Sequence, residues 1–224
     1  MTTTLRTVAL VAARDEEGRI GPCVRALRDI VTEVVVVDDA SSDATPAEAN
    51  EAGATVLRVE RRLGKGAALE GALRRLDRAD VWLLADGDLG ETAKGLSALV
   101  DLIAAGEADL AIATFPPARA GGFGLVRRAS AHLIRGQAGF DATEPLSGQR
   151  ALTAAAMDAV RPLADGFGVE TAMTIDAVRA GLRVIEVPID GLDHRPTHRD
   201  PAGFLHRARQ GWDIARAVAP RVWR

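Results

Sequence analysis

The sequence predicts an α/β fold in which helices cover both faces of a mostly parallel sheet. Two observations carry this prediction. Short apolar runs alternate with helix-like stretches in the first half of the chain, as they do in parallel sheets with crossover helices. Several of these runs end in acidic or polar residues, which is typical of strands whose carboxyl ends bind a ligand. With 224 residues, 47% of them hydrophobic, the chain is long enough to bury one sizeable core.

The expected elements follow one another at short spacing. The first apolar run, residues 8–13, is followed by the charged stretch 14–17. The second run, residues 34–37, consists of four valines and leads directly into acidic residues. A third, shorter run covers residues 55–59, and a fourth, residues 81–85, is apolar throughout. The stretches between these runs that favour helices are roughly residues 17–30, 44–52 and 66–77.

Paired carboxylates follow the fourth run, at Asp86 and Asp88. Alternate residues of a strand share a face, so both side chains are expected to point at one ion from the end of the strand. Carboxylate oxygens are hard ligands that suit Mg²⁺ or Mn²⁺, and a bound diphosphate would complete the coordination shell. The alternative for this triplet is a capped surface turn, because Asp-x-Asp is common in turns.

Composition and charge narrow the function classes. No apolar run approaches the roughly 20 residues that span a bilayer, and the N-terminus lacks the apolar stretch of a signal peptide. The single cysteine, Cys23, excludes an internal disulfide and is typical of a reducing cytoplasm. A nucleic-acid partner is not expected, because no basic stripe is interleaved with aromatic residues and only 4% of residues are aromatic.

The C-terminal segment, residues 194–224, has a different charge balance. It contains seven arginines against two aspartates, together with three of the four histidines. We expect a basic loop followed by a helix that packs on the same domain, which covers residues 1–193. The alternative is a helix that lies on an anionic membrane surface, which would make the protein peripheral at the inner face of the membrane.

Residues 7 to about 190 resemble glycosyltransferase family 2, whose members have the GT-A fold. Five motifs in the family's order carry the resemblance. They are residues 12–17 after the first strand, residues 38–45 after the second, Gly64-Lys65-Gly66, Asp86-Gly87-Asp88, and Ser147-Gly148-Gln149-Arg150. The stretch 166–170 and the region up to Pro188 are also typical of the family. The resemblance implies a GT-A sheet and a donor that is a nucleotide-sugar, a UDP- or GDP-sugar.

The resemblance assigns residues to the donor and to a divalent ion. Asp39 would accept hydrogen bonds from the base or ribose; its alternative is a helix N-cap, for which Asp43 is the better candidate. Lys65, between glycines, would meet a phosphate or the base edge; otherwise it is a solvated lysine at a helix start. Asp88 is expected to bind the Mg²⁺ or Mn²⁺ ion directly and to serve catalysis, with Asp86 shared between metal and ribose. The residues expected to bind the donor nucleotide are Ala12, Ala13, Arg14, Glu16, Asp39, Lys65 and Asp86, although Arg14 and Asp15 replace the usual Tyr and Asn.

Other residues are expected on the acceptor side. Glu170, at the start of a helical stretch, would act as general base or orient the acceptor; the alternative is a favourable charge at a helix N-terminus. Gln149 and Arg150 would line the sugar pocket, or Arg150 would form a structural ion pair. In the loop after the last strand, His194 is the candidate third metal ligand, with Arg195 and Arg199 as phosphate clamps.

The acceptor and the reaction stay open at this point. Short family 2 enzymes resemble dolichyl-phosphate and polyprenyl-phosphate sugar synthases, and the basic C-terminal segment favours such a lipid phosphate. The stretches 145–150 and 166–170, together with His194 and Arg195, also resemble glucosyl-3-phosphoglycerate synthase, whose acceptor is small, soluble and phosphorylated. A nucleotidyltransferase is a further alternative, against which the acidic stretch 14–17 counts, and a non-catalytic sugar-nucleotide sensor is another. The sequence does not decide between retention and inversion, or between a monomer and a homodimer.

Overall fold

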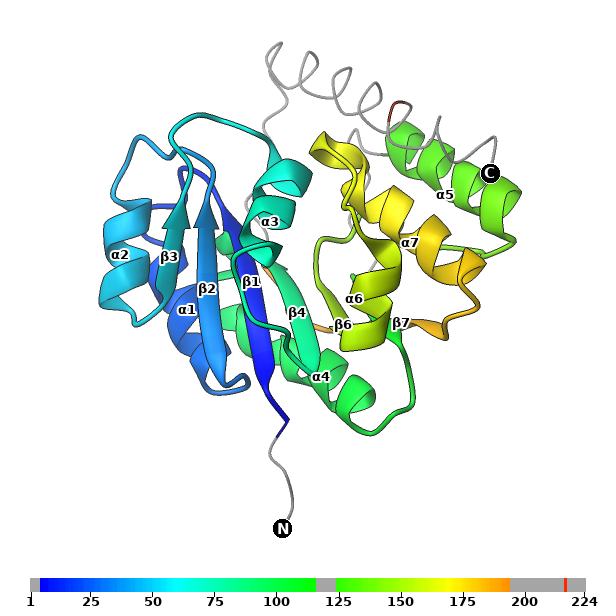
Figure 1. Ribbon diagram of the computed structural model, residues 1–224, viewed down its shortest axis with the longest axis horizontal. Coiled ribbons are helices and arrows are strands. Elements are labelled where there is room, and N and C mark those ends of the chain that lie inside the picture. Colours follow the sequence, from blue (N-terminus) through cyan, green and yellow to red (C-terminus); the bar gives the residue numbers. More distant parts are fainter. Residues whose placement is uncertain (1–4, 116–123, 194–215, 217–224) are drawn as a thin grey trace.

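The computed structural model describes residues 5–115, 124–193 and 216. Within these residues, one sheet of seven strands is covered by helices (Figure 1). The strands are β1 Thr7–Ala13, β2 Glu33–Asp38, β3 Thr55–Arg58, β4 Val81–Asp86, β5 Leu110–Thr114, β6 Arg150–Thr153 and β7 Val184–Pro188. The α-helices are α1 Ile20–Arg28, α2 Thr45–Glu51, α3 Lys65–Leu73, α4 Ser97–Ala104, α5 Gly124–Ala138, α6 Ala154–Val160 and α7 Val169–Arg179. Two 3₁₀ segments, η1 Gly87–Leu96 and η2 Gly166–Gly168, complete the elements.

The strand order across the sheet is β3-β2-β1-β4-β6-β5-β7. All neighbouring strands are parallel except at β6, which runs antiparallel to both β4 and β5. The predicted mostly parallel α/β sheet is therefore confirmed. The four strands before residue 90 lie where the apolar runs predict them, and the helices between them are slightly shorter than expected, since α1 begins at Ile20 and α3 ends at Leu73.

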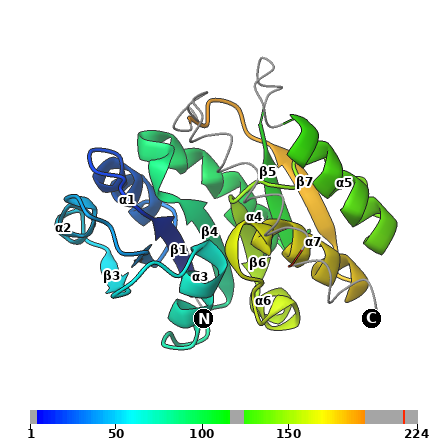
Figure 2. The same ribbon diagram turned by 90° about the horizontal axis from the view of Figure 1, so that it is seen from above.

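Both faces of the sheet are buried, which explains why its central strands read as continuous apolar runs. Alternate residues of β1 point to opposite faces: Ala9 and Val11 pack with α1, α2, η1 and α4, while Val8 and Leu10 pack with α3, α6 and α7. Figure 2 shows these two layers of helices on either side of the sheet. No helix among the described residues is long and apolar enough to cross a membrane.

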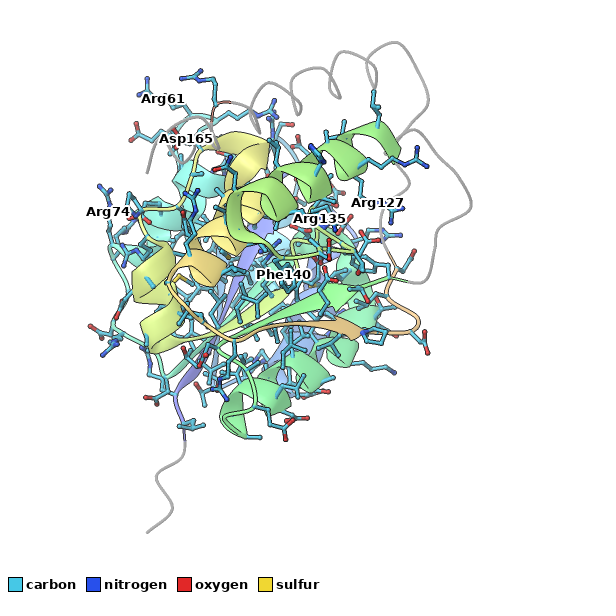
Figure 3. All side chains as sticks on the ribbon, turned by 90° about the vertical axis from the view of Figure 1, so that its right-hand side faces the viewer. Arg61, Arg74, Arg127, Arg135, Phe140 and Asp165 are labelled. Carbon is cyan, nitrogen blue, oxygen red and sulfur yellow. The ribbon has the colours of Figure 1, made fainter. Side chains whose placement is uncertain are left out.

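Helix α5 packs on α7 and holds the connection that leads into β6. Ile134 of α5 contacts Ile175 of α7 in a third, smaller apolar cluster. Arg127 and Arg135, labelled on α5 in Figure 3, form ion pairs with Glu144 and Asp141. This connection, residues 139–149, is thereby fixed at several points before it reaches the edge of the sheet where the ligand-binding residues are expected.

A buried carboxylate joins α3 to the segment after α6. Glu70 is 9% exposed and accepts hydrogen bonds from Arg161, Arg74 and the amide of Leu163. Burial raises the pKa of Glu70, but the hydrogen bonds from Arg161, Leu163 and Arg74 outweigh it and leave the pKa below its ordinary value. Glu70 therefore stabilises the fold in its ionised form.

Glu70→Gln is expected to lower the free energy of unfolding at neutral pH by about 1–3 kcal/mol, because the half-buried Arg161 and the buried Leu163 amide lose a charged acceptor. Since the folded-state pKa is lowered, this contribution is complete above the ordinary carboxyl pKa and is lost as the pH falls through the folded-state pKa. The difference in Tm between wild type and variant should therefore shrink below about pH 4. Asp158→Asn is the matched control, because Asp158 pairs with Arg78 at the solvent-exposed surface and acts on Arg161 through its charge without a hydrogen bond to it. Equal losses in both variants would contradict the role given to Glu70.

Candidate active site at the carboxyl edge of the sheet

The carboxyl ends of β1, β2 and β4 meet at one edge of the sheet. Ala13 of β1 is in register with Asp38 of β2, and Ala12 is in register with Asp86 of β4. The two acidic strand ends therefore flank the end of β1. Their presence at one edge is as the sequence predicts, whereas the order of the strands comes from the structure. In open α/β sheets this edge is where ligands bind.

The carboxylate of Asp39 organises the loop before α3. Asp39 Oδ1 accepts from the amide of Leu63 at 2.7 Å, and Oδ2 accepts from the amide of Gly64 at 2.9 Å. Gly64 has φ 91°, a left-handed conformation that favours glycine. Asp39 thereby places Lys65 at the first turn of α3. Its expected contact with a base or ribose stays a prediction.

The loop after β1 is tied to the loop after β2. The amide of Asp15 donates to Ser41 Oγ, and Asp15 Oδ1 accepts from Ser42. The amide of Glu16 donates to Thr45 Oγ1, while Asp43 accepts from the Thr45 amide directly before α2. The N-cap position itself is occupied by Ala44, so Asp43 binds the helix start from one residue earlier than predicted. The roles expected of Ala12, Ala13, Arg14 and Glu16 in donor binding stay predictions.

Lys65 lies between two carboxylates from distant parts of the chain. Its Nζ is 2.6 Å from Asp86 Oδ1 and 2.8 Å from Glu170 Oε1. Asp86 ends β4, and Glu170 lies in the first turn of α7. The side chains of Lys65 and Glu170 are 18% and 9% exposed, and that of Asp86 is 33% exposed. The alternative of a solvated lysine at a helix start is therefore wrong.

The charges of Lys65, Asp86 and Glu170 stabilise one another. Burial favours the neutral form of Lys65, but the carboxylates of Asp86 and Glu170 outweigh this and raise the pKa of the ammonium above its ordinary value. Lys65 is therefore charged at physiological pH and balances one of its two acidic neighbours. We call Lys65, Asp86 and Glu170 the lysine cluster.

The loop before β6 completes the cluster. Gln149 is fully buried and its Nε2 donates to Asp86 Oδ2 at 3.1 Å. A Cβ at Gly148 would overlap both Lys65 Nζ and Asp86 Oδ2, so with any other residue here the ion pair would have to shift. Sequence reasoning identified Gln149 but missed the role of Gly148. The glycine within the Ser-Gly motif was the available signal, since glycine often marks a close approach of the backbone to another group.

Arg150 lies near enough to Glu170 and Asp86 for their charges to act on it, but its hydrogen bonds go to other groups. Its side chain is 1% exposed and donates to the carbonyl of Ser147 and to Thr174 Oγ1. Burial lowers its pKa to about 10. Its partners are a carbonyl and a hydroxyl rather than a carboxylate, so the structure supports neither the predicted sugar contact nor the predicted ion pair. Arg150 instead connects the loop before β6 to α7 inside the protein.

Asp88 lies in η1 and not in β4, which ends at Asp86. The prediction that both carboxylates extend from one strand is therefore wrong; the chain turns at Gly87, which is packed against Ala13 and Ile20. Arg19, which sequence reasoning missed, donates to the carbonyl of Asp88 and forms an ion pair with Asp193. No sequence signal distinguished Arg19 from a surface arginine.

Asp193, the residue before His194, is held beside η1. The Asp193 amide donates to Thr92 Oγ1 at 3.1 Å, and Arg19 holds the Asp193 carboxylate at 3.2 Å. His194, Arg195 and Arg199 themselves lie outside the described residues, as does the 194–224 segment apart from Arg216. Their predicted roles as metal ligand and phosphate clamps, and the packing of the segment, are not tested.

Several negative charges lie at the edge of the sheet around Asp86 and Asp88. The thiol of Cys23 is buried beneath it, and burial, followed by the charges of Asp88, Asp86 and Glu16, raises the pKa of Cys23 to about 12. Hard carboxylate oxygens in a negative field fit Mg²⁺ or Mn²⁺. Among the described residues, however, no three acidic, histidine or cysteine side chains gather closely enough to hold an ion. An ion at Asp86 and Asp88 would therefore need further ligands from outside this set.

Comparison with known proteins places this geometry in a family. The model of "Glycosyl transferase family 2" matches residues 8–156. "Glycosyltransferase AglJ" of Haloferax volcanii is 30% identical over 178 residues, which are 75% of this chain and 57% of the relative. "Glycosyltransferase AglD" of the same organism is 32% identical over 213 residues, 86% of this chain and 33% of that protein. The chain thus spans between about a third and just over half of the length of these curated relatives.

A solved structure with a similar fold is glucosyl-3-phosphoglycerate synthase from Mycobacterium tuberculosis. Its complex with Mn²⁺, UDP and glucosyl-3-phosphoglycerate has a TM-score of 0.80 and 25% sequence identity, and the match covers 97% of this chain and 80% of that one. The same enzyme has been crystallised with Mg²⁺ and UDP, and that structure is 26% identical with a TM-score of 0.80. The GT-A fold expected from the sequence is confirmed by this similarity.

Proposed function

The chain belongs to glycosyl transferase family 2, and from that premise we propose that it transfers a sugar from a nucleotide-sugar to a phosphorylated acceptor. A polyprenyl phosphate is the first candidate for the acceptor. The lysine cluster is the observation that carries the proposal. It joins the strand end expected to bind the donor to the helix expected to face the acceptor, with Lys65 at 2.6 Å from Asp86 and 2.8 Å from Glu170.

The proposed reaction depends on a divalent ion, Mg²⁺ or Mn²⁺. Asp88 would be its direct ligand, with Asp86 shared between the ion and the ribose. His194 would be a third ligand, and its neighbour Asp193 is anchored to η1 by Thr92 and Arg19. When bound, the ion neutralises charge on the departing nucleoside diphosphate. The two Mycobacterium tuberculosis complexes, which contain Mn²⁺ or Mg²⁺ with UDP, support this part of the proposal and favour a UDP-sugar as the donor.

The burial of Glu170 and its ion pair with Lys65 favour an acceptor that attacks through an ionised phosphate. Its carboxylate is 9% exposed and is already engaged by Lys65. A carboxylate that shares a buried ion pair is poorly placed to take a proton from a hydroxyl group. A phosphate oxygen needs no such base: it bonds to the anomeric carbon while the bond from that carbon to the β-phosphate oxygen breaks. We therefore assign Glu170 to positioning on the acceptor side.

A small, soluble phosphorylated acceptor is the second candidate. The observation that favours it is the similarity over 97% of this chain to glucosyl-3-phosphoglycerate synthase. In either case the donor nucleotide would be bound by Ala12, Ala13, Arg14, Glu16 and Asp39 together with the lysine cluster. Arg195 and Arg199 would hold phosphate oxygens, and the basic 194–224 segment would pack on the domain. With a lipid acceptor, that segment would also meet the anionic membrane surface.

The decisive experiment compares the two acceptors with the same donors. The protein is incubated with UDP-glucose, UDP-N-acetylglucosamine or GDP-mannose and Mn²⁺, with either a polyprenyl phosphate in detergent or 3-phosphoglycerate. We expect a lipid-linked product whose sugar is released by mild acid, since a glycosyl phosphate is acid-labile, and no product with a chelator. A phosphoglycerate glycoside instead would establish the second candidate. Formation of UTP or GTP when pyrophosphate is added to these donors would indicate a nucleotidyltransferase, and binding without turnover would indicate a sensor; either outcome would overturn sugar transfer.

A further inference from the structure

In the proposed function, Lys65 and the metal ion would bind the same carboxylate, that of Asp86. Its ammonium lies 2.6 Å from Asp86 Oδ1, the carboxylate that the proposed function assigns to the metal and ribose. The other oxygen of Asp86 accepts from Gln149 at 3.1 Å. Both oxygens of Asp86 are therefore engaged by side chains of the protein itself.

The surroundings suit a compact ammonium in particular. A Cβ at Gly148 would overlap Lys65 Nζ, so the backbone packs closely against the charged group. A planar guanidinium is bulkier than an ammonium and delocalises its charge over a fork of donors. Lysine occurs only at positions 65 and 94, although the chain contains 28 Lys and Arg residues in total. A lysine in this chain is thus rare, and this one stands where a small point charge bridges two carboxylates.

We propose that Lys65 competes with the divalent ion for Asp86, so that the ligand-free protein binds the ion weakly and acquires it together with the nucleotide diphosphate. This inference rests on the metal site of the proposed function. It assigns to Lys65 a positioning role that controls the order of binding.

Two further observations support the inference. Among the described residues no three acidic, histidine or cysteine side chains gather to hold an ion, so diphosphate oxygens are needed to complete its coordination. Lys65 is also held by Glu170 at 2.8 Å. If it leaves Asp86, it retains this second ion pair, and a bound diphosphate offers it a new anionic partner. The exchange therefore does not leave a buried ammonium uncompensated.

The test is a titration of Mn²⁺ into the nucleotide-free protein, followed by the electron paramagnetic resonance signal of free Mn²⁺. Lys65→Met is expected to bind Mn²⁺ about tenfold more tightly than wild type, because Asp86 and Glu170 lose their shared cation. Adding UDP should bring the two affinities closer together. Lys94→Met removes the only other lysine, which is exposed on η1, and should match wild type. A Lys65→Met protein that binds Mn²⁺ no more tightly than wild type would overturn the inference.

A second pair of variants covers the case in which Lys65→Met does not fold. Lys65→Met combined with Glu170→Gln leaves the net charge of the lysine cluster unchanged, so it avoids the additional unbalanced negative charge of Lys65→Met alone. This double variant should bind Mn²⁺ more tightly than Glu170→Gln alone, and equal affinities would again count against competition at Asp86. The titration contains no sugar and no acceptor. A failure of the proposed sugar transfer would therefore leave its result standing, and a failure of competition would leave sugar transfer intact.

Discussion

Gly148→Ala is expected to reduce turnover of the nucleotide-sugar by about a hundredfold, the scale on which a displacement of roughly 1 Å acts on catalytic groups. The added methyl group would overlap Lys65 Nζ and Asp86 Oδ2 at once. Both atoms belong to the ion pair between Lys65 and Asp86, and Lys65 is also held by its ion pair with Glu170. The lysine cluster would therefore have to open to accommodate one carbon atom.

Steady-state turnover with the donor, measured beside a thermal melt, checks this expectation. The variant should still fold, because overpacking by one methyl group costs about 1–3 kcal/mol. Gly71→Ala is the matched control: a Cβ at this exposed position of α3 meets nothing within 4 Å. It should leave turnover unchanged and stabilise the helix slightly. Full activity in Gly148→Ala would show that the arrangement of the lysine cluster does not matter for the reaction.

Asp88→Asn is expected to remove the metal-dependent part of nucleotide binding and to lower turnover by about 10²–10³-fold, as loss of a group that stabilises developing charge does elsewhere. Asparagine keeps the shape of the side chain but not its negative charge. The segment is also held through its main chain, because Arg19 donates to the carbonyl of Asp88, a contact that asparagine retains. A thermal melt that matches wild type would assign the effect to the lost charge.

Calorimetric titration of UDP and of GDP, with Mn²⁺ and then with a chelator, separates the two contributions to binding. In the wild type the chelator should weaken nucleotide binding, whereas in Asp88→Asn it should change little. Asp101→Asn, which removes an exposed carboxylate from α4, controls for net charge and should behave like wild type. If Asp88→Asn kept the response to the chelator and its turnover, the metal would have to be assigned to other residues.

Much of the fold could be predicted because its signals are local. Four valines that lead into Asp38, and the apolar run that leads into Asp86, are patterns that any buried parallel strand shows. Parallel neighbours bring such ends to one edge, so the sequence predicted that these acidic ends share an edge, and the register shows them on either side of β1. The family motifs predicted the GT-A fold in the same way.

The partners of the site residues depended on the tertiary structure. A strand pattern cannot show where a strand stops, so Asp88 was placed on β4 although the chain turns into η1 after Asp86. Likewise, Arg150 was expected to line the sugar pocket or to form an ion pair, yet its hydrogen bonds to Ser147 and Thr174 hold it in the interior.

The sequence by itself determined the alternation of the first four strands with helices, the acidic edge of the sheet and the family, because each depends on residues close together in the chain. Only the tertiary structure decided that Lys65 joins Asp86 to Glu170, with Gly148 making room for the pair. These residues come from α3, β4, α7 and the loop before β6. Their mutual distances are set by how the helices pack on the sheet, and no pattern within a single element contains that information.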